Sequence, residues 1–285
     1  MENNKQLKLE VLMSVMNQKD FSIAYKTKIK SDLLIINQCN EEKYDETVVE
    51  GYKWRMISTC ERGSHLSRQK ALDNASGDIC LFCDDDEELV DGYCDLILNA
   101  YERLPKASSI EFNVDRINNQ SNKSYYIIKK IRRSLKYRGY GTPMLSVKIR
   151  DIKNNEIRMN EIFGSGSEWG GGEDSLFEDE IRKKGLKMYE YPATIASIDY
   201  ANGSTWIKGH DERYFYNLGA YSEYRYKRNL LLKILRRLYT CIRLRKDKTL
   251  SFRGKMCWMR LGGKGFLRNI TYKDFKEKNN AKTSS

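Results

Sequence analysis

The feature that most constrains the fold is a set of short apolar runs in the first part of the chain. They are LEVLMSVM at residues 9–16, LLIIN at 33–37, WRMIST at 54–59 and ICLFC at 79–83. Runs of this length that are almost continuously apolar are typical of strands buried on both faces of a sheet. Helical patterns alternate with them further along the chain. The sequence therefore predicts an α/β fold with a mostly parallel sheet.

The later elements follow the same alternation. Ser64 is a candidate N-cap and Gly77 a candidate stop for the first long helix. A glycine-rich loop then leads into a helix that should begin near Glu173 and end at Gly185. We expect helices at residues 65–76 and 91–104, and further strands at 110–114, 145–149 and 188–191.

Size and cysteine content narrow the class of protein. A chain of 285 residues can bury one sizeable core, so we expect one elaborated domain with an appendage. Cys80 and Cys83 lie in an apolar run without a second CxxC pair, which favours buried, reduced thiols over a zinc site. The polar start MENNKQLKLE lacks the apolar core of a secretory signal, so we expect a cytoplasmic or peripheral protein.

The charge is unevenly distributed. Residues 213–285 hold 20 Lys and Arg against 4 Asp and Glu, a net charge of +16, whereas residues 1–212 hold 31 against 35. This asymmetry indicates a polyanionic partner for the C-terminal quarter, either nucleic acid or anionic lipid headgroups. We therefore place a boundary between a globular domain, 1–212, and a basic, helical C-terminal region, 213–285.

Residues 224–246 of that region read as a basic amphipathic helix. Its apolar face would carry Leu231, Ile234, Leu235, Leu238 and Ile242, and its basic face Lys233, Arg236, Arg237 and Arg243. Three interpretations compete: binding to an anionic membrane surface, binding to nucleic acid, and a core helix with a solvated basic face. We favour the membrane, and no nucleic acid is expected because no recognisable nucleic-acid module is present.

An acidic run follows the strand predicted at 79–83. Asp84, Asp85 and Asp86 would lie at the carboxyl edge of the sheet, where open α/β sheets bind ligands. Carboxylates at Asp84 and Asp86 can approach one divalent cation while that cation binds a nucleotide diphosphate. The alternative is a solvated acidic turn before the helix at 91.

Residues 63–87 and 164–177 resemble the family 2 glycosyltransferases, and the order of elements agrees over residues 9–210. The resemblance implies the GT-A fold, an α/β/α sandwich. It divides the catalytic domain into a nucleotide-binding half, about 1–115, and an acceptor-binding half, about 116–212. Within this family, the chain resembles the enzymes that build bacterial capsule and exopolysaccharide.

The resemblance also implies roles in donor binding. Asp84 and Asp86 would hold Mn²⁺ or Mg²⁺ on the donor diphosphate, and Asp85 would point toward the ribose or the neighbouring backbone. For Arg68 and Lys70 two interpretations stay open, contact with the donor phosphate and an exposed helical face. Many relatives have an aspartate that binds the base at the end of the second strand, where this chain has Asn37. An amide can also read a base edge, so the nucleotide's identity stays open.

A second motif lies far downstream. Trp169, Gly171, Gly172, Glu173 and Asp174 resemble the Gly-Gly-Glu-Asp segment of galactosyltransferases and other polysaccharide-building enzymes. The glycines would let the backbone approach the acceptor sugar, and the tryptophan would offer it a flat face.

Asp174 is the preferred general base and Glu173 the alternative, or a ligand for sugar hydroxyls. An acidic pair in the first turn could instead only stabilise the helix. The helix dipole should lower the pKa of Asp174. Candidates for contacts in a segment that closes over the donor are Asp199, Ser204, Trp206 and His210.

Together these features predict an inverting, metal-dependent transferase that moves a hexose or N-acetylhexosamine from a UDP-sugar to a glycan. The expected acceptor is polyprenyl-diphosphate-linked, and the expected location is the inner face of the cell membrane, where bacterial surface polysaccharides are assembled. The alternative is a catalytically silent module that binds sugar nucleotides or a membrane surface.

Overall fold

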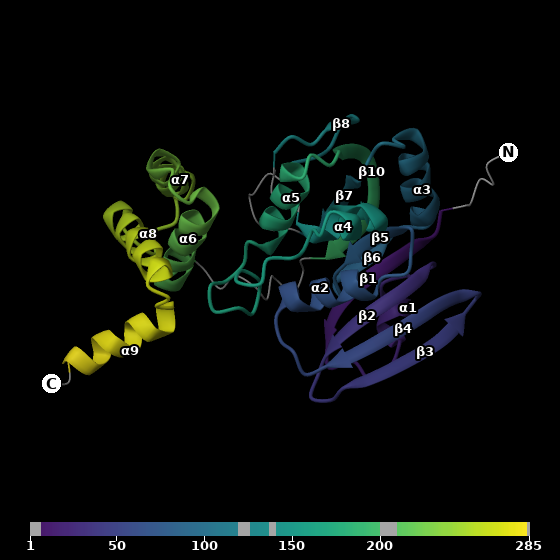
Figure 1. The fold of residues 1–285 in the computed structure, drawn as a ribbon, viewed down its shortest axis with the longest axis horizontal. Coiled ribbons are helices and arrows are strands. Elements are labelled where there is room, and N and C mark those ends of the chain that lie inside the picture. The colour runs from purple at the N-terminus through teal and green to yellow at the C-terminus, as the bar shows by residue number, and fades with distance from the viewer. Residues whose placement is uncertain (1–6, 119–125, 137–140, 200–209, 284–285) are drawn as a thin grey trace. The chain divides into compact units, whose positions relative to one another are not determined.

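A computed structural model describes residues 7–118, 126–136, 141–199 and 210–283. The chain divides into two compact units (Figure 1). The first comprises Met1–Asn160 and Glu173–Gly203, and the second comprises Glu161–Gly172 and Ser204–Ser285. The sequence suggested one boundary at residue 212. In the structure the chain crosses between the units three times, because the segment 161–172 groups with the C-terminal helices.

The first unit is built on a ten-stranded sheet with the order β3-β4-β2-β1-β5-β9-β7-β10-β6, and β8 also pairs with β10. The pairs β4–β2, β2–β1, β1–β5 and β7–β10 are parallel, and the others are antiparallel. The α/β class is confirmed, with a sheet that is mixed rather than mostly parallel. The strands are β1 Leu9–Met16, β2 Asp32–Gln38, β3 Lys43–Val49, β4 Tyr52–Thr59, β5 Ile79–Cys83, β6 Glu87–Leu89, β7 Ser109–Ile117, β8 Arg132–Arg133, β9 Leu145–Lys148 and β10 Met188–Asp199.

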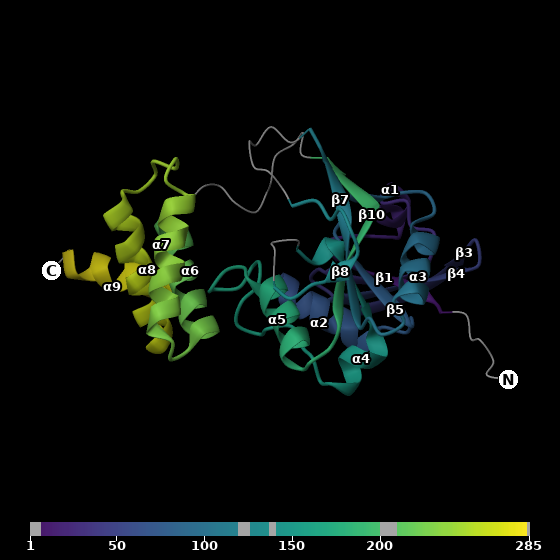
Figure 2. The same cartoon turned by 90° about the horizontal axis from the view of Figure 1, so that it is seen from above.

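Helices cover both faces of this sheet, as the two sides of the strands in Figure 2 show. One buried cluster joins the strands to α1 and α3, and a second joins them to α2, α4 and α5. Because alternate residues of a strand point to opposite faces, β1 contributes Val11 and Met13 to the first cluster and Leu12 to the second. The helices are α1 Ser22–Lys26, α2 Ser64–Asn74, α3 Tyr93–Arg103, α4 Ile149–Asn154 and α5 Glu173–Lys183, with a short 3₁₀ turn η1 at Thr142–Met144.

The carboxyl ends of β1, β2 and β5 meet at one edge of the sheet. Parallel register places Val15 opposite Asn37, and Met13 opposite Cys83. The loop after β1, the end of β2 and the acidic run after β5 are therefore neighbours, as ligand binding at this edge requires.

The first turn of α2 differs from our expectation. Gly63, with φ of 123°, occupies the N-cap position without a side-chain cap, and Ser64 is already helical. A glycine is suited to this position because side chains rarely adopt such a φ. Ser64 is therefore not the N-cap, and its hydroxyl is available for a partner elsewhere.

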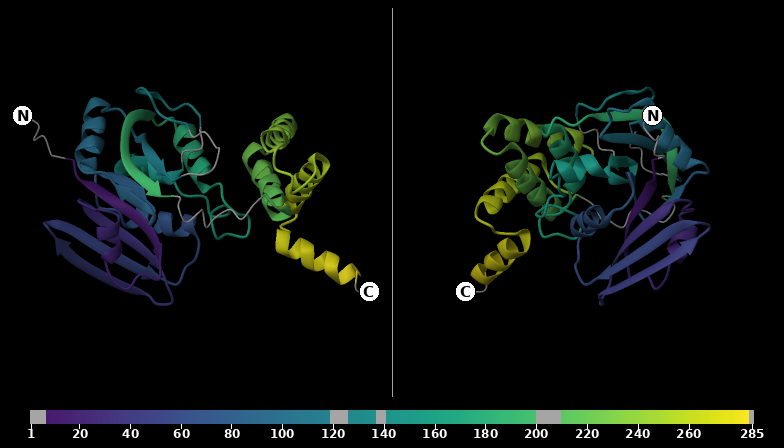
Figure 3. Two further views of the ribbon diagram at one scale, coloured as in Figure 1. Left: turned by 180° about the vertical axis from the view of Figure 1, so that it is seen from behind. Right: turned by 45° about the vertical axis from the view of Figure 1, so that its right-hand side comes forward.

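The second unit contains the helices α6 Glu212–Tyr226, α7 Leu230–Arg243, α8 Phe252–Leu267 and α9 Tyr272–Thr283 (Figure 3). Phe215 of α6, Cys241 of α7 and Met259 of α8 form its buried core. Helices α6 and α8 approach closely at two glycines. A methyl group at Gly262 would lie 1.8 Å from the carbonyl oxygen of Tyr216, and one at Gly219 would lie 2.0 Å from that of Met259.

The amphipathic helix predicted within 224–246 is present as α7, but its orientation contradicts the core-helix interpretation. Lys233 is buried, whereas Leu231, Leu235 and Ile242 are exposed. None of the helices within the described ranges is long and apolar enough to cross a bilayer.

Candidate functional site

Arg68 joins the two motifs that the sequence singled out. It lies on the buried side of α2 and is only 8% exposed. Its Nη2 donates to Asp84 Oδ1 at 2.9 Å, and its Nη1 donates to Asp174 Oδ1 at 3.1 Å and to Glu173 Oε1 at 3.4 Å. One guanidinium thus links the acidic run after β5 to the acidic pair that opens α5. Its contact with a donor stays a prediction.

The acidic run contains a third carboxylate that sequence reasoning missed. Ligand oxygens of Asp84, Asp86 and Glu87 all lie within 4.8 Å of one another. Glu87 begins β6, where it pairs with Ile198 of β10, and its side chain is buried beside those of the two aspartates. The burial alternates along β6, with Glu87 and Leu89 inside and Glu88 outside. Glu87-Glu88-Leu89 does not alternate between apolar and polar residues, so nothing in the sequence marked Glu87 as buried.

These three carboxylates fit a divalent cation. Both oxygens of Glu87 are buried, and neither accepts a hydrogen bond within the described part of the chain. Burial, and then Asp84 and Asp86, raise the pKa of Glu87 well above its usual range. A buried carboxylate without a partner is costly, and an oxygen-rich site of this kind suits Mg²⁺ or Mn²⁺.

Within the acidic run, Asp85 and Asp86 are more exposed than Asp84. Burial, followed by repulsion from Asp84, raises the pKa of both Asp85 and Asp86. Lys26, at the end of α1, donates from Nζ to the backbone carbonyl of Asp85 at 3.3 Å. No local pattern singled out Lys26, because only the parallel pairing of β1 with β5 brings it to the acidic run.

Glu173 and Asp174 have different surroundings although they are neighbours. Glu173 is buried, and its Oε1 accepts a hydrogen bond from Ser64 Oγ at 2.7 Å in addition to the one from Arg68. Asp174 is half-buried, with 26% of its side chain exposed. Its Oδ1 accepts from Arg68 and from Thr142 Oγ1 at 3.2 Å, whereas its Oδ2 accepts no hydrogen bond from any residue that the structure describes.

The pKa of Asp174 is shifted in the direction opposite to our expectation. Desolvation raises it to about 6, Arg68 opposes the increase, and Glu173 and Asp84 add to it. The expectation that the helix dipole would lower this pKa was wrong, because removing a carboxylate from water outweighs a dipole at one helix end. A carboxylate with a pKa near 6 is a better base than an ordinary aspartate.

Asn37 holds the neighbouring loop. Its Oδ1 accepts from the backbone N–H of Gln18 at 2.9 Å, and its Nδ2 donates to the Gln18 carbonyl at 2.9 Å and to Ser58 Oγ at 3.1 Å. Both amide hydrogens are therefore used inside the protein. In this structure Asn37 orders the loop after β1, and its contact with a base stays a prediction.

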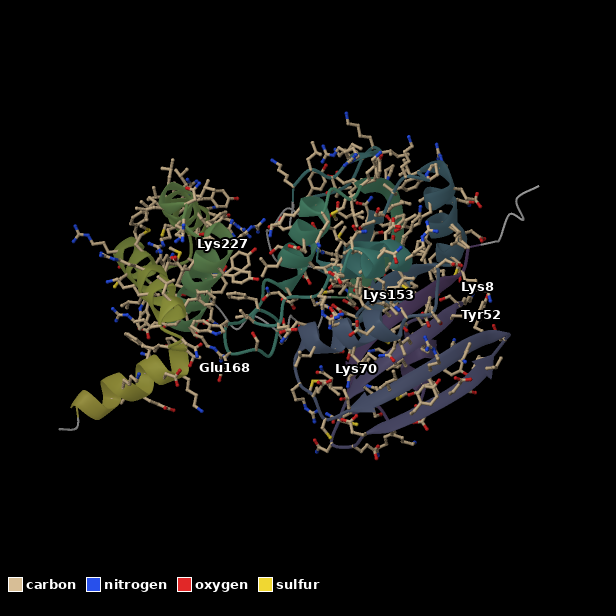
Figure 4. All side chains as sticks on the ribbon, viewed as in Figure 1. Lys8, Tyr52, Lys70, Lys153, Glu168 and Lys227 are labelled. Atoms are coloured by element: carbon tan, nitrogen blue, oxygen red, sulfur yellow. The ribbon has the colours of Figure 1, made fainter. Side chains whose placement is uncertain are left out.

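Lys70 also lies on α2, where Figure 4 labels it. Its Nζ pairs with Glu61 at 2.7 Å and donates to Thr59 Oγ1 at 2.9 Å. These contacts connect α2 to the end of β4 and so help fix the helix that carries Arg68.

The other half of the second motif belongs to the second unit. Trp169 is buried, stacked on Tyr216 at 6.4 Å between ring centroids and edge-on to Phe266 at 5.2 Å. A methyl group at Gly172, where φ is 132°, would lie 2.7 Å from the Tyr221 ring. Gly171 is exposed. Trp169 and Gly172 thus serve packing within this unit, and the flat face expected of the tryptophan is covered.

The four candidates downstream of this motif do not form one group in the part of the chain that the structure describes. Asp199 ends β10 and accepts a hydrogen bond from Asn118 Nδ2 at 3.0 Å. His210 pairs with Asp247 inside the second unit. Ser204 and Trp206 lie outside the described residues.

A second group of buried carboxyls lies further along α5 and on the neighbouring strand β7. Glu178, one turn along α5, is buried and pairs with Arg182 at 2.5 Å, and Arg182 lies 4.0 Å from Glu111 of β7. Burial, and then repulsion between the two carboxylates, raises the pKa of Glu111 to about 9. The pKa of Glu178 rises to about 7, mainly through burial. Nothing in the sequence distinguished these glutamates from surface residues.

Comparisons with known proteins agree on the fold. The model of the family described as "Glycosyl transferase family 2" matches residues 3–162. The structure of S. aureus TarS 1-349 in complex with UDP-GlcNAc is similar with a TM-score of 0.55 and 11% identity, over 93% of each chain. The structure of its complex with UDP gives 0.54 and 12% over 95% of this chain and 78% of that one. A third structure, of S. aureus TarS, gives 0.55 and 13%, over 86% of this chain and 44% of that one. A search of curated proteins found no match. The GT-A fold expected from the resemblance is confirmed.

Proposed function

The chain belongs to glycosyl transferase family 2, and from that premise we propose that it transfers a hexose or N-acetylhexosamine from a UDP-sugar to a glycan, with inversion and with the help of Mn²⁺ or Mg²⁺. Glycosyl transfer is the chemistry of the family. The donor nucleotide, the metal and the stereochemistry are our proposal. The fold shared with a protein whose structure holds UDP-GlcNAc supports a UDP-sugar as donor.

The observation that carries the proposal is the bridge made by Arg68. It brings a cluster of potential cation ligands and a potential base to one place, although Asp84 and Asp174 are far apart in the sequence. A transferase needs both groups on either side of the reacting sugar. An acidic turn or a capped helix would need no such bridge.

Asp84, Asp86 and Glu87 would hold the cation, which when bound neutralises the charge that develops on the departing diphosphate. Lys26 adds a fixed positive charge beside the run. Arg68 keeps Asp84 in position from the side of α2.

Asp174 is the proposed base. Its Oδ2 would take the proton from the acceptor hydroxyl as that oxygen bonds to the anomeric carbon and the bond from this carbon to the diphosphate oxygen breaks. The electron pair of the broken bond leaves with UDP. Glu173 is the weaker candidate because Ser64 and Arg68 both bind its Oε1 and the side chain is buried.

We propose a polyprenyl-diphosphate-linked glycan as the acceptor, at the inner face of a bacterial membrane during assembly of capsule or another surface polysaccharide. The resemblance to polysaccharide-building enzymes supports this choice. The nine Lys and Arg residues without a single Asp or Glu in residues 224–246 support a membrane location.

The first test is turnover of donors without an acceptor. Transferases release free sugar slowly from their donors, so we expect Mn²⁺-dependent hydrolysis of at least one of UDP-galactose, UDP-glucose, UDP-GlcNAc and UDP-GalNAc. Absence of both binding and hydrolysis with all four would instead support a silent module and contradict the UDP-sugar proposal.

The second test measures the cation directly. Titration of Mn²⁺ in the presence of UDP, followed by electron paramagnetic resonance, should give tight binding that weakens at least about tenfold in Asp86→Asn and in Glu87→Gln. Glu88→Gln is the matched control, since Glu88 points outward and pairs with Lys28. Equal Mn²⁺ affinity in all four proteins would rule out this cluster as the metal site.

A further inference from the structure

Helix α7 packs against its unit with its polar side. Lys233 is buried and pairs with Glu223 of α6, and Thr240 is buried two helical turns later on the same side. Cys241 joins the core formed by Phe215 and Met259. These residues fix the rotation of the helix about its own axis.

The opposite side of α7 is an exposed apolar stripe, which we define as Leu231, Leu235, Leu238 and Ile242. Their exposures are 65%, 49%, 36% and 59%. The spacing of four, three and four residues places all of them on one face. A surface helix of a globular unit normally buries this face and exposes its lysines. Here the arrangement is reversed, which marks an interaction surface.

The charge around the stripe selects the partner. Exposed basic residues lie at both ends of α7: Lys227 precedes the helix (Figure 4), Arg243 is in its last turn, and Arg245 and Lys246 follow it. A second copy of the chain would bring the same positive charges against these, which opposes self-association. An anionic lipid surface offers negative charge together with an apolar interior. Such a surface would therefore bind both the basic residues and the apolar stripe of α7.

We propose that α7 lies in the headgroup region of an anionic bilayer, with the apolar stripe turned toward the acyl chains and the exposed basic residues at the two ends of the helix at the lipid phosphates. A helix of 14 residues is about 21 Å long, shorter than the roughly 30 Å of a hydrocarbon core, so it lies on the membrane. This inference rests on the membrane part of the proposed function and specifies the surface that acts there.

Sedimentation with vesicles tests the proposal in the full-length protein without donor or metal. With equal parts phosphatidylglycerol and phosphatidylcholine, the protein should pellet at low salt and bind more weakly at high salt. With phosphatidylcholine alone, binding should be much weaker. Leu231→Gln/Leu235→Gln should reduce the affinity for the anionic vesicles at least about tenfold.

The control is Leu135→Gln, a leucine in the first unit that is 77% exposed, and this variant should bind vesicles as the wild type does. Circular dichroism and hydrolysis of a soluble UDP-sugar should be unchanged in both variants. Because vesicle binding is measured without donor, an inactive protein that binds vesicles would contradict the proposed function and leave this inference intact.

Three results would overturn the inference. The wild-type protein could remain in the supernatant with anionic vesicles at low salt. The double variant could bind as tightly as the wild type. Analytical ultracentrifugation could find a dimer that the double variant converts to monomer, which would assign the apolar stripe to a second copy of the chain.

Discussion

At the scale of single residues, the site depends on how one arginine distributes its hydrogen bonds among carboxylates. Asp174 shares Arg68 with Asp84 and Glu173, so it is held in place without being fully neutralised. Desolvation then dominates the pKa of this proposed base and raises it to about 6. The hydrogen bonds from Arg68 and Thr142 hold Asp174 in position, and desolvation raises its pKa.

A pH profile follows from this pKa. A base must be deprotonated to act, so kcat/KM should rise about tenfold per pH unit below about pH 6 and level off above it. Asp174→Asn should lower kcat by about 10²- to 10⁴-fold at pH 7.5. Steady-state kinetics with whichever UDP-sugar the hydrolysis test identifies as donor measures both.

Glu173→Gln is the comparison for that experiment. It should leave the position of the pH midpoint within about one unit, since Asp174 still titrates. If Glu173→Gln removed the acidic limb while Asp174→Asn kept it, the two roles would be exchanged.

Glu111→Gln tests the second group of carboxyls through stability. A carboxyl with a pKa of about 9 in the folded chain, against an ordinary value of 4.5, binds its proton more tightly when folded. Its destabilising effect is therefore absent below pH 4.5 and grows as the pH rises toward 9. Glu111→Gln should raise the free energy of unfolding by about 1–3 kcal/mol at pH 8 and by less at pH 5, measured with urea.

Glu190→Gln should behave differently. Glu190 is buried in the same region but pairs with Arg132 at 2.6 Å, so removing its charge should destabilise the protein at pH 8. Stabilisation by both substitutions, or by neither, would contradict this assignment of the buried charges.

The sequence predicted the carboxylates of the site better than their partners. Asp84, Asp86, Glu173 and Asp174 were selected; the structure brings Asp84, Glu173 and Asp174 to Arg68, and Asp86 lies beside Asp84. Glu87 and Lys26 were missed because their positions depend on β6 pairing with β10 and on β1 pairing with β5. Such long-range pairings leave no local pattern in the sequence.

At the scale of elements, the contact between α6 and α8 is the tightest in the second unit. Gly262 lies against the backbone of Tyr216, where a side chain has no space and the neighbour cannot rotate away. Two helices can approach this closely only where neither carries a side chain at the crossing.

Gly262→Ala should therefore destabilise the second unit by about 1–3 kcal/mol or more through overpacking. Gly254→Ala, in the first turn of the same helix, would place its methyl group 3.3 Å from Ser251 Oγ, which must move by only a few tenths of an ångström, and at least 3.6 Å from its other neighbours. It should be neutral or stabilise by up to about 1 kcal/mol, because alanine favours helix more than glycine does. Thermal unfolding of both variants measures the difference, and equal effects would contradict the close approach.

Strands made of continuous apolar runs were predicted well, whereas β6 was missed and β10, expected over 188–191, extends to Asp199. The apolar runs became β1, β2, β4 and β5 with ends shifted by at most two residues. Strand β3 was missed because it is an edge strand whose residues are exposed or half-exposed along its whole length. Lys43–Val49 forms a hairpin with β4 through Glu50 and Gly51, both at positive φ.

At the scale of the whole molecule, the two units have separate buried cores. Those of the first lie on the two faces of the sheet, and the second surrounds Phe215. The composition of the sequence showed that the C-terminal part is different, because its charge is different. It could not show that residues 161–172 belong there, since these residues are tied to the unit by aromatic packing with residues about fifty to a hundred positions later.

Separate cores predict separate responses to core substitutions. Phe215→Ala should cost about 3–5 kcal/mol in the second unit, whereas Ile97→Ala should cost about 2–5 kcal/mol in the first. Hydrogen exchange followed by mass spectrometry should show lost protection in α6 to α8 for the former and in β1, β5 and α3 for the latter. Loss of protection across both units in either variant would mean that they unfold together.

The segment 161–172 affects how this protein can be recombined with its relatives. Phe163 and Trp169 lie among Tyr216, Tyr221 and Phe266, so this short stretch and the C-terminal helices must be inherited together. A chimera that exchanges only residues 204–285 would surround Phe163 and Trp169 of this chain with aromatic side chains of the relative. One that exchanges 161–172 as well keeps the aromatic cluster whole, and it joins the host chain immediately before the two carboxylates at the start of α5.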